Sequence, residues 1–500
     1  MYERRRFAPP REGVITLDPR ERKSIMRKFC QNSFRAMQLS AVTVLATLLI
    51  WNTSSRGQSF PGGFIEKAGS HAVRPRLTAS QIQSFVPPRR GKFKFPSPYN
   101  TEGIRITVPE DCGGKDCVTY VGYSYWMNMN NHVGSDTMLI FLSLNRSLGG
   151  TGPTLFTYNK VTDEVKNLGP IFDPTSSFSW YPGADWYFSA TQPTKLYVND
   201  SGPTFYRYDV VVKKFEIVFD VRARFGSDKG VTQNHSSADD RVHSGTLLCK
   251  KAGCSDGTHV ATKEKEMMGC LVYHQPSNSF SYFPRKGKYD ECNLDRGGRW
   301  LLIIDGDPVD GLGNRIIDLQ NNTETVLPGQ TAGRLGHLDM GDGYAVGANG
   351  HHRLPNTTAV IKFPPANTKW PGTVVHYNSD WDTAVANHVS HQNRRAGVPA
   401  EEQYACGSNL DHGRQENEIV CFRLDTSHNT LVVAPVMTNP DAPGPCDDYC
   451  KAPKGNLDVT GRYFIWTSNL GGSRMDAFIV KVPAQLLYSQ DRSAANKAAR

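Results

Sequence analysis

The chain has 500 residues, of which 38% are hydrophobic, and a formal net charge of +9. Residues 1–57 hold 11 Lys and Arg against 4 Asp and Glu, and the other 46 basic and 44 acidic residues nearly balance, which excludes the broad basic surface of a nucleic-acid-binding domain. A mean hydropathy of −0.47 is typical of a soluble chain, and 45 Gly with 31 Pro favour many turns between short antiparallel strands.

The first 57 residues have the composition of an export signal. A basic stretch at 4–35 precedes an apolar run of about 13 residues at 39–51, which is short for a membrane span of about 20 residues but suits the core of a signal peptide. Ser55 and Gly57 are small residues in the −3/−1 arrangement, so we expect cleavage near Gly57. The alternative is an uncleaved signal anchor at 39–51, which would tether the protein to a membrane.

The remainder of the chain divides into three parts by composition. Residues 58–103 contain Pro, Gly and Arg without periodicity and are predicted to be a linker. Strand-like segments follow one another from residue 104 to residue 485, without a convincing amphipathic helix between them. Residues 486–500 are polar and are predicted to be a frayed tail.

One pattern repeats through the strands of residues 104–485. Each copy begins with a short strand that carries a polar residue, continues through a tight turn and leads into an apolar second strand, as in 336–349. Seven copies, spaced roughly 44 to 68 residues apart, are typical of propeller blades. The polar residues that open the copies are His132, Tyr187, His235, Asn293, His337, His388 and Asn456. The pattern therefore predicts an all-β, seven-bladed β-propeller of four-stranded antiparallel blades.

The last copy has room for only three strands before the chain runs out. Propellers leave only short, protected strand edges, so a blade without its outer strand needs one from elsewhere. We expect an early segment, near 104–108 or 118–123, to supply that strand and to close the ring.

Cysteine usage agrees with export. Cys30 precedes the apolar run, and the other ten cysteines of the eleven fall in neighbouring pairs. Pairing across local hairpins predicts disulfides between Cys112 and Cys117, Cys249 and Cys254, Cys270 and Cys292, Cys406 and Cys421, and Cys446 and Cys450. The sequence contains no CxxC spacing, which argues against a cysteine-bound zinc centre. Disulfides indicate an oxidising compartment, so we expect a secreted or periplasmic protein.

Two turns resemble those of known propeller families. Asp295-Arg-Gly-Gly-Arg299 and Asp458-Val-Thr-Gly-Arg462 are similar to the turn that ends the inner strand of WD-repeat-like and TolB-like units. The run 455–461 resembles a phrase found in a group of uncharacterised secreted bacterial proteins. The resemblance covers about residues 104–483 and implies the architecture but no activity, because propellers host many functions. The Asp of each turn is expected to cap that turn.

Equivalent positions of the blades lie at equal radius, so the seven polar residues are expected to form a ring around the central channel. Neutral imidazoles suit a divalent metal such as Mn or Zn, which makes His337, His388 and His391 the candidate metal ligands. A metal there would bind a substrate carboxylate, and a nearby His would remove the proton from the adjacent carbon. The candidate catalytic residues are His235, Tyr187 and Arg394.

This chemistry is that of a polysaccharide lyase that cleaves uronates by β-elimination. The oligogalacturonate lyases, seven-bladed propellers with a His-bound metal at the channel mouth, are similar in outline, although no full ligand motif of theirs can be placed on this sequence. The resemblance implies an acidic glycan as the substrate. The alternative is a non-catalytic binding or scaffold propeller of the cell envelope that recognises a protein or a glycan. A hydrogen-bonded His ring without an open channel would favour the alternative.

Overall fold

The computed structural model describes residues 59–489 apart from 70–73, 120, 122, 133, 184, 306–311, 329–334, 349–356, 370, 378–387, 409, 411, 414–415 and 445–447. The predicted signal sequence, its alternative as an anchor at 39–51 and most of the tail 486–500 lie outside these residues. The chain separates into two units, Met1–Ser59 and Phe60–Arg500, and every described strand belongs to the second. No helix in the described part of the chain is long and apolar enough to cross a membrane.

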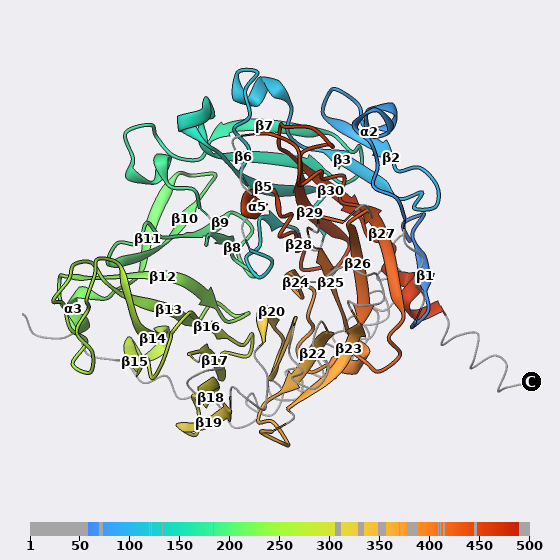
Figure 1. Cartoon of the computed structure of the whole chain (residues 1–500). Coiled ribbons are helices and arrows are strands. Elements are labelled where there is room, and N and C mark those ends of the chain that lie inside the picture. The colour runs from blue at the N-terminus through green and yellow to red at the C-terminus, as the bar shows by residue number, and fades with distance from the viewer. Residues whose placement is uncertain are drawn as a thin grey trace, which may run out of the picture. The chain divides into compact units, whose positions relative to one another are not determined.

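Seven antiparallel sheets of the unit Phe60–Arg500 lie around a common centre (Figure 1). Five of the sheets have four strands and two have five. The first strands of neighbouring sheets contact one another, so the first strand of each sheet lines the centre. The architecture is therefore the predicted all-β, seven-bladed propeller.

The blades follow one another along the chain, and each begins with its innermost strand. Blades 1 to 3 contain β4 (Met129–Asn130), β5 (Thr137–Leu144), β6 (Gly152–Asn159) and β7 (Val165–Pro170); β8 (Tyr187–Phe188), β9 (Lys195–Val198), β10 (Thr204–Asp209) and β11 (Lys214–Asp220); and β12 (Lys229–Ser236), β13 (Val242–Cys249), β14 (Glu266–His274) and β15 (Ser279–Pro284). Blades 4 and 5 contain β16 (Glu291–Leu294), β17 (Trp300–Ile304), β18 (Leu312–Asp318) and β19 (Thr323–Pro328); and β20 (Gly336–Met340), β21 (Tyr344–Ala348), β22 (Thr357–Lys362) and β23 (Gly372–Tyr377). Blades 6 and 7 contain β24 (His388–Ser390), β25 (Tyr404–Ser408), β26 (Glu418–Arg423) and β27 (Thr430–Pro435); and β28 (Asn456–Leu457), β29 (Tyr463–Ser468) and β30 (Asp476–Lys481). The helices are α2 (Ala79–Phe85), α3 (Arg222–Phe225) and α5 (Asp448–Lys451).

The position of a strand within its blade explains its sequence. The second strands, such as β17 and β29, are buried along their whole length and read as apolar runs, because neighbouring blades cover both of their faces. The outermost strand β19 keeps only Leu327 buried and begins with three polar residues, at 323–325. The apolar runs that the repeat pattern identified are therefore the strands that form the interfaces between blades.

The ring is closed by the chain segment that precedes blade 1. Strand β3 (Glu102–Arg105) pairs antiparallel with β30, with Ile104 opposite Ile479, and so becomes the fourth strand of blade 7. This confirms the expectation that an early segment completes the last blade. Residues 58–103, which were expected to be a linker, carry two further strands: β2 (Gly91–Lys94) pairs with β3, and β1 (Phe64–Glu66) pairs with β27 of blade 6. Composition did not reveal them because neither strand belongs to the repeat, and the partner of β1 is distant in sequence.

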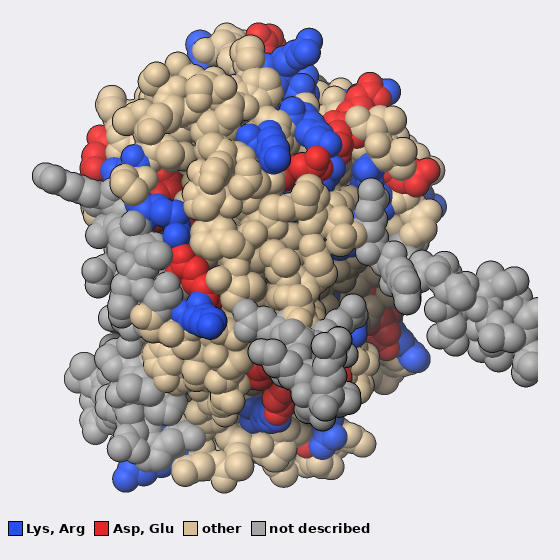
Figure 2. All heavy atoms as spheres, turned by 90° about the vertical axis from the view of Figure 1, so that its right-hand side faces the viewer, with Lys and Arg blue, Asp and Glu red and all other residues tan. Residues whose placement is uncertain are grey.

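Ion pairs hold this N-terminal segment to blades 6 and 7. The Arg74 guanidinium contacts both carboxylate oxygens of Glu418, at 2.5 and 2.9 Å, and Glu66 at 2.7 Å. Lys481 contacts Glu102 at 2.8 Å across the pair β3–β30. Figure 2 shows the side of the molecule where β1 lies, and basic and acidic side chains are interspersed there. Ion pairs between neighbouring side chains therefore attach the N-terminal segment to blades 6 and 7. Neither positive nor negative charge dominates this side of the molecule.

Aspartates at the ends of inner strands cap turns and join blades. Oδ1 of Asp295 accepts hydrogen bonds from the amides of Arg299 and Trp300, both at 2.8 Å, which confirms the predicted cap. Its Oδ2 accepts from the amide of Gly343 in blade 5 at 3.1 Å. Asp458 caps its turn in the same way, through the amides at positions 462 and 463, and accepts from Asn131 of blade 1 at 2.6 Å. One carboxylate thus fixes its own turn and the next blade.

Four of the five predicted disulfides are present. They are Cys112–Cys117, Cys249–Cys254, Cys270–Cys292 and Cys406–Cys421. The fifth depends on Cys446, which lies outside the described residues. Only Cys406–Cys421 spans a hairpin, between β25 and β26. Cys270 belongs to β14 and Cys292 to β16, so this disulfide joins blade 3 to blade 4.

We expect the double substitution Cys270→Ala/Cys292→Ala to lower the free energy of unfolding by about 3 kcal/mol, because this disulfide closes a loop of 22 residues. The substitution Cys249→Ala/Cys254→Ala is the matched control, and its loop of 5 residues predicts a smaller loss of about 2 kcal/mol. Chemical denaturation of the oxidised proteins measures both. An equal or larger loss in the control would contradict a role for the Cys270–Cys292 link in joining the blades.

Candidate functional site

The segment Tyr123–Met127, just before the first inner strand, lies against the inner strands of several blades. The Tyr125 hydroxyl donates to Glu291 Oε2 of blade 4 at 2.6 Å. Its backbone carbonyl accepts from Gln392 Nε2, just beyond β24 of blade 6, at 2.8 Å. Trp126 Nε1 donates to the Asn234 carbonyl of blade 3 at 2.9 Å. Contacts with three blades place this segment across the centre of the propeller, where it acts as a plug.

His337 and His388, two of the predicted metal ligands, are brought together. Their rings stack with centroids 4.1 Å apart and an interplanar angle of 13°. The Tyr123 ring of the plug lies 5.9 Å from His337 and 5.6 Å from His388. His388 is buried, and neither of its ring nitrogens has a hydrogen-bond partner among the described residues. Burial and the neighbouring His337 hold the pKa of His388 well below its usual range, so its imidazole is neutral.

His391 is tied into the fold by both ring nitrogens. Nδ1 lies 2.9 Å from the Tyr404 carbonyl, which can only accept, so Nδ1 carries the proton. Nε2 then accepts from the Tyr344 hydroxyl at 2.6 Å. The His391 amide donates to Asp339 Oδ2 at 2.6 Å, in the position that joins blade 5 to blade 6. His391 thus has the contacts of a residue that links blades.

The predicted catalytic residues do not form one group. Tyr187 is buried with its hydroxyl 2.8 Å from Ser236 Oγ, and burial raises its pKa, so the phenol stays protonated. The Arg394 guanidinium lies 3.3 Å from the His391 carbonyl and 3.2 Å from Gln392 Oε1, beyond the end of β24. His235 stacks under Trp126 of the plug, with centroids 5.6 Å apart, and burial lowers its pKa to about 3.

The predicted metal ligands are not arranged around a common point. His388 begins β24 and His391 follows its end, and three residues of extended chain span about 10 Å. The rings of His337 and His388 lie in nearly parallel stacked planes, and lone pairs lie in the plane of each imidazole, so the two planes do not meet at one metal position. No group of three or more His, Cys, Asp or Glu in the described part of the chain is placed to hold a metal ion. The residues therefore do not fit a three-histidine site.

A cavity of about 280 Å³ opens beside the plug, at the end of the channel where the inner strands begin. Its described lining residues are Tyr123, Tyr125, Trp126, Gln233, Asp290, Glu291, Ile304, Gly336 and His337. Three aromatic rings, two carboxylates, one amide and one imidazole thus meet in one place. Of the predicted site residues, only His337 contributes. The dense aromatic run at 120–126 was the sequence signal for this site, but its place in the centre depends on contacts with distant blades.

A second buried network lies at the opposite ends of the inner strands. Asp339 accepts from the His391 amide and from Gln392 Nε2 at 2.9 Å, and burial raises the pKa of its carboxyl to about 7. Arg296 donates to the Ser236 carbonyl at 2.9 Å, and burial lowers the pKa of its guanidinium. These contacts join blades 3 to 6 and leave the cavity beside Tyr123 as the candidate binding site.

No protein-family model and no curated protein sequence matches the chain. Among solved structures, an oligogalacturonate lyase in complex with manganese aligns with a TM-score of 0.55 at 9% identity, over 80% of this chain and 98% of that chain. The oligogalacturonate lyase of Vibrio parahaemolyticus aligns with the same TM-score of 0.55, 9% identity and coverage of 80% and 98%. At this identity the likeness establishes the propeller fold that these proteins share with the chain.

Proposed function

We propose that this protein is an exported glycan-binding propeller that holds a sugar residue in the cavity beside Tyr123. The observation that carries the proposal is the convergence of Tyr123, Tyr125 and Trp126 with Asp290 and Glu291 in that cavity. Aromatic faces pack against the apolar face of a sugar ring, and carboxylates accept hydrogen bonds from its hydroxyl groups. The four disulfides suit the oxidising compartment in which such a protein would act.

Burial supports binding over catalysis. His388 is buried beside Tyr123 of the plug, His235 lies under Trp126, and both nitrogens of His391 are engaged within the fold. These features favour the non-catalytic function among the two that the sequence left open. The described lining of the cavity includes two carboxylates and neither Lys nor Arg, so a neutral sugar suits it better than a uronate.

The second candidate is a metal-dependent lyase that acts on an acidic glycan. It is favoured by the likeness of the fold to an oligogalacturonate lyase in complex with manganese. In this proposal His337, His388 and His391 are the metal ligands, and His235, Tyr187 and Arg394 are the catalytic residues. It requires the plug to move and the imidazoles to reorient.

Isothermal titration calorimetry against neutral, acidic and amino-substituted oligosaccharides tests the first candidate. We expect binding that Tyr123→Ala weakens about tenfold, the equivalent of about 1.4 kcal/mol, because the ring contributes stacking area to the cavity. Trp180→Ala is the matched control, since Trp180 is an aromatic residue that is 65% exposed and does not line the cavity. Failure of every oligosaccharide to bind, with the protein folded, would refute glycan binding.

Metal content separates the two candidates. The lyase predicts about one equivalent of Mn or Zn in the purified oxidised protein, and its loss in the variant His337→Ala/His388→Ala. If neither protein contains metal and a chelator does not change glycan binding, the glycan-binding function is supported and the metal-dependent lyase is refuted.

A further inference from the structure

A groove lies between helix α2 and the turn that joins β29 to β30 of blade 7. Its volume is about 590 Å³, twice that of the cavity beside Tyr123. The described residues that line it are Ala79, Ile82, Gln83, Val86, Pro88, Arg105, Pro109, Asn469, Leu470, Gly472, Ser473, Arg474 and Asp476. The groove shares no described lining residue with the proposed glycan site, so what it binds is an independent question.

The polar floor of the groove is an arginine pair around one buried carboxylate. Asp476 accepts from Arg105 Nη2 at 2.6 Å, from Thr107 Oγ1 at 2.7 Å and from Arg474 Nη1. All three nitrogens of the Arg105 guanidinium have acceptors within the fold, because Nε also donates to the Thr107 carbonyl at 3.0 Å and Nη1 to the Pro87 carbonyl at 2.7 Å. Arg474 Nη2 is buried and has no hydrogen-bond partner among the described residues. A buried donor without an acceptor is costly and points to an acceptor that a ligand would supply.

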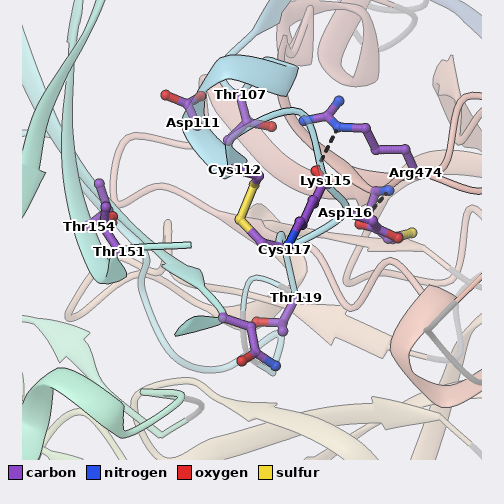
Figure 3. Close-up of a disulfide and its surroundings, with 12 residues drawn as sticks. Thr107, Asp111, Cys112, Lys115, Asp116, Cys117, Thr119, Thr151, Thr154 and Arg474 are labelled. Carbon is purple, nitrogen blue, oxygen red and sulfur yellow. Dashed lines mark hydrogen bonds between the residues drawn. A yellow bond between two sulfur atoms is a disulfide. The ribbon is translucent and has the colours of Figure 1, made fainter. Parts of the chain in front are cut away.

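The disulfide loop 112–117 fixes Arg474 in this position (Figure 3). Arg474 Nε donates to the Lys115 carbonyl at 3.4 Å, and the amide of Met475 donates to Asp116 Oδ1 at 3.1 Å. Asp116 stands behind the arginine, and burial raises the pKa of its carboxyl. Because two residues of one short cross-linked loop hold positions 474 and 475, the guanidinium is oriented before any ligand arrives.

The walls of the groove are apolar. Helix α2 presents Ile82 and Val86, and Leu470 faces them from the β29–β30 turn. The helix is short, but a capping box stabilises its N-terminus. The Thr78 side chain accepts from the Gln81 amide at 3.2 Å, and the Gln81 side chain accepts from the Thr78 amide at 2.8 Å. The groove therefore combines an aliphatic cleft with one cationic floor.

We propose that this groove binds a carboxylate with an unbranched alkyl tail, such as a free fatty acid. Arg105 and Arg474 line the groove on either side of Asp476, and a carboxylate on a ligand would supply the acceptor that Arg474 Nη2 lacks among the described residues. The carboxylate accepts from Arg474 Nη2, and the tail packs along Ile82, Val86 and Leu470. Both requirements, for the charge and for the tail, distinguish this ligand from small anions and from neutral apolar molecules.

Calorimetric titration with decanoate, below the concentration at which it forms micelles, tests the proposal on the full oxidised protein. We expect one equivalent of decanoate to bind, and neither acetate, which lacks the tail, nor decyltrimethylammonium, which reverses the charge, to bind. Arg474→Gln should weaken decanoate at least tenfold. Arg222→Gln is the matched control, because Arg222 forms an exposed ion pair with Asp220 far from the groove. Equal binding of decanoate and decyltrimethylammonium would overturn the proposal, as would unchanged affinity in Arg474→Gln.

A second variant covers the case in which Arg474→Gln does not fold, since Arg474 also contacts Asp476. Leu470→Asp places a carboxylate in the groove without touching either arginine, and should abolish decanoate binding while Leu470→Ala only weakens it. Retention of full affinity in Leu470→Asp would refute the site. Glycan binding should be unchanged in both variants, so a failure of the glycan proposal would be seen separately.

Discussion

Acidification from pH 6 to pH 5 will lower the free energy of unfolding, by about 1.4 kcal/mol for each net proton that unfolding takes up, because buried imidazoles become free to bind protons in this range. Five buried histidines are the source of the uptake. Burial lowers the pKa of His235 and His376 to about 3 and of His243 and His391 to about 4, and holds that of His388 well below its usual range. Unfolding releases each imidazole to a pKa near 6.5, so below that value the unfolded chain binds more protons.

Buried carboxyl groups act in the opposite direction, since burial raises the pKa values of Asp116, Asp185, Asp295 and Asp476 and, by a larger amount, those of two further groups. Burial raises the pKa of Asp339 and of Glu416 to about 7, so in the folded protein they hold protons that the unfolded chain releases. Their contribution to stability grows as the pH falls from about 7 toward the ordinary carboxyl range. The five imidazoles that gain a proton on unfolding outnumber the two carboxyls with the largest opposing shifts, so we expect a net uptake of protons.

Denaturant titrations at pH 6.0, 5.5 and 5.0 measure this slope with the disulfides intact. His376→Gln should remove one proton from the net uptake and reduce the slope by about 1.4 kcal/mol per pH unit. The matched control is His412→Gln, since the His412 side chain is 55% exposed and pairs with an exposed carboxylate. A stability that is flat or rises on acidification in this range would show that the buried imidazoles do not stay neutral.

Arg74→Met will cost about 3 to 5 kcal/mol of stability, because it leaves the Glu418 carboxylate buried without its cation. Glu418 is 1% exposed. Its carboxylate accepts hydrogen bonds from Nε and Nη2 of Arg74 and from the Tyr99 hydroxyl, the last at 2.5 Å. The pair connects the N-terminal segment to β26 of blade 6. We therefore expect this substitution to loosen strand β1 first, which hydrogen exchange of residues 64–66 would detect.

A double-mutant cycle separates the ion pair from simple packing. Arg74→Met/Glu418→Gln should be less destabilised than Arg74→Met alone, since the second change removes the unpaired charge. Arg222→Met serves as the exposed counterpart, with an expected cost below about 1 kcal/mol. If Arg74→Met and Arg222→Met cost the same, the Arg74–Glu418 pair does not anchor the segment.

The sequence predicted what depends on local repetition and missed what depends on distant contacts. Inner strands and apolar second strands recur along the chain, so the pattern identified the propeller and two candidate segments for its closure, of which the segment that begins at 104 overlaps β3. The segment 58–103 has no such repetition, so β1 and β2 were not predicted.

The candidate site shows the same limit. His337 and His388 were expected to be close because equivalent positions of neighbouring blades adjoin, and their rings do stack. His391 follows the end of the strand that His388 begins, but its Tyr344 and Tyr404 partners come from other strands, and spacing alone does not reveal them. The plug belongs to no repeat, so neither its position in the channel nor the cavity that it creates with Asp290 and Glu291 follows from the pattern.

The pairing of β3 with β30 also sets the order in which the protein can mature. During synthesis β3 emerges before any blade and can pair with β2 on one edge, whereas β30 is the last described strand to leave the ribosome. The other edge of β3 therefore waits unpaired for almost the whole of translation. Contacts of such high sequence separation form slowly, and an unpaired strand edge is prone to aggregation while it waits. Blades 1 to 6 can assemble progressively, but the cooperative native state arises only when the two ends meet.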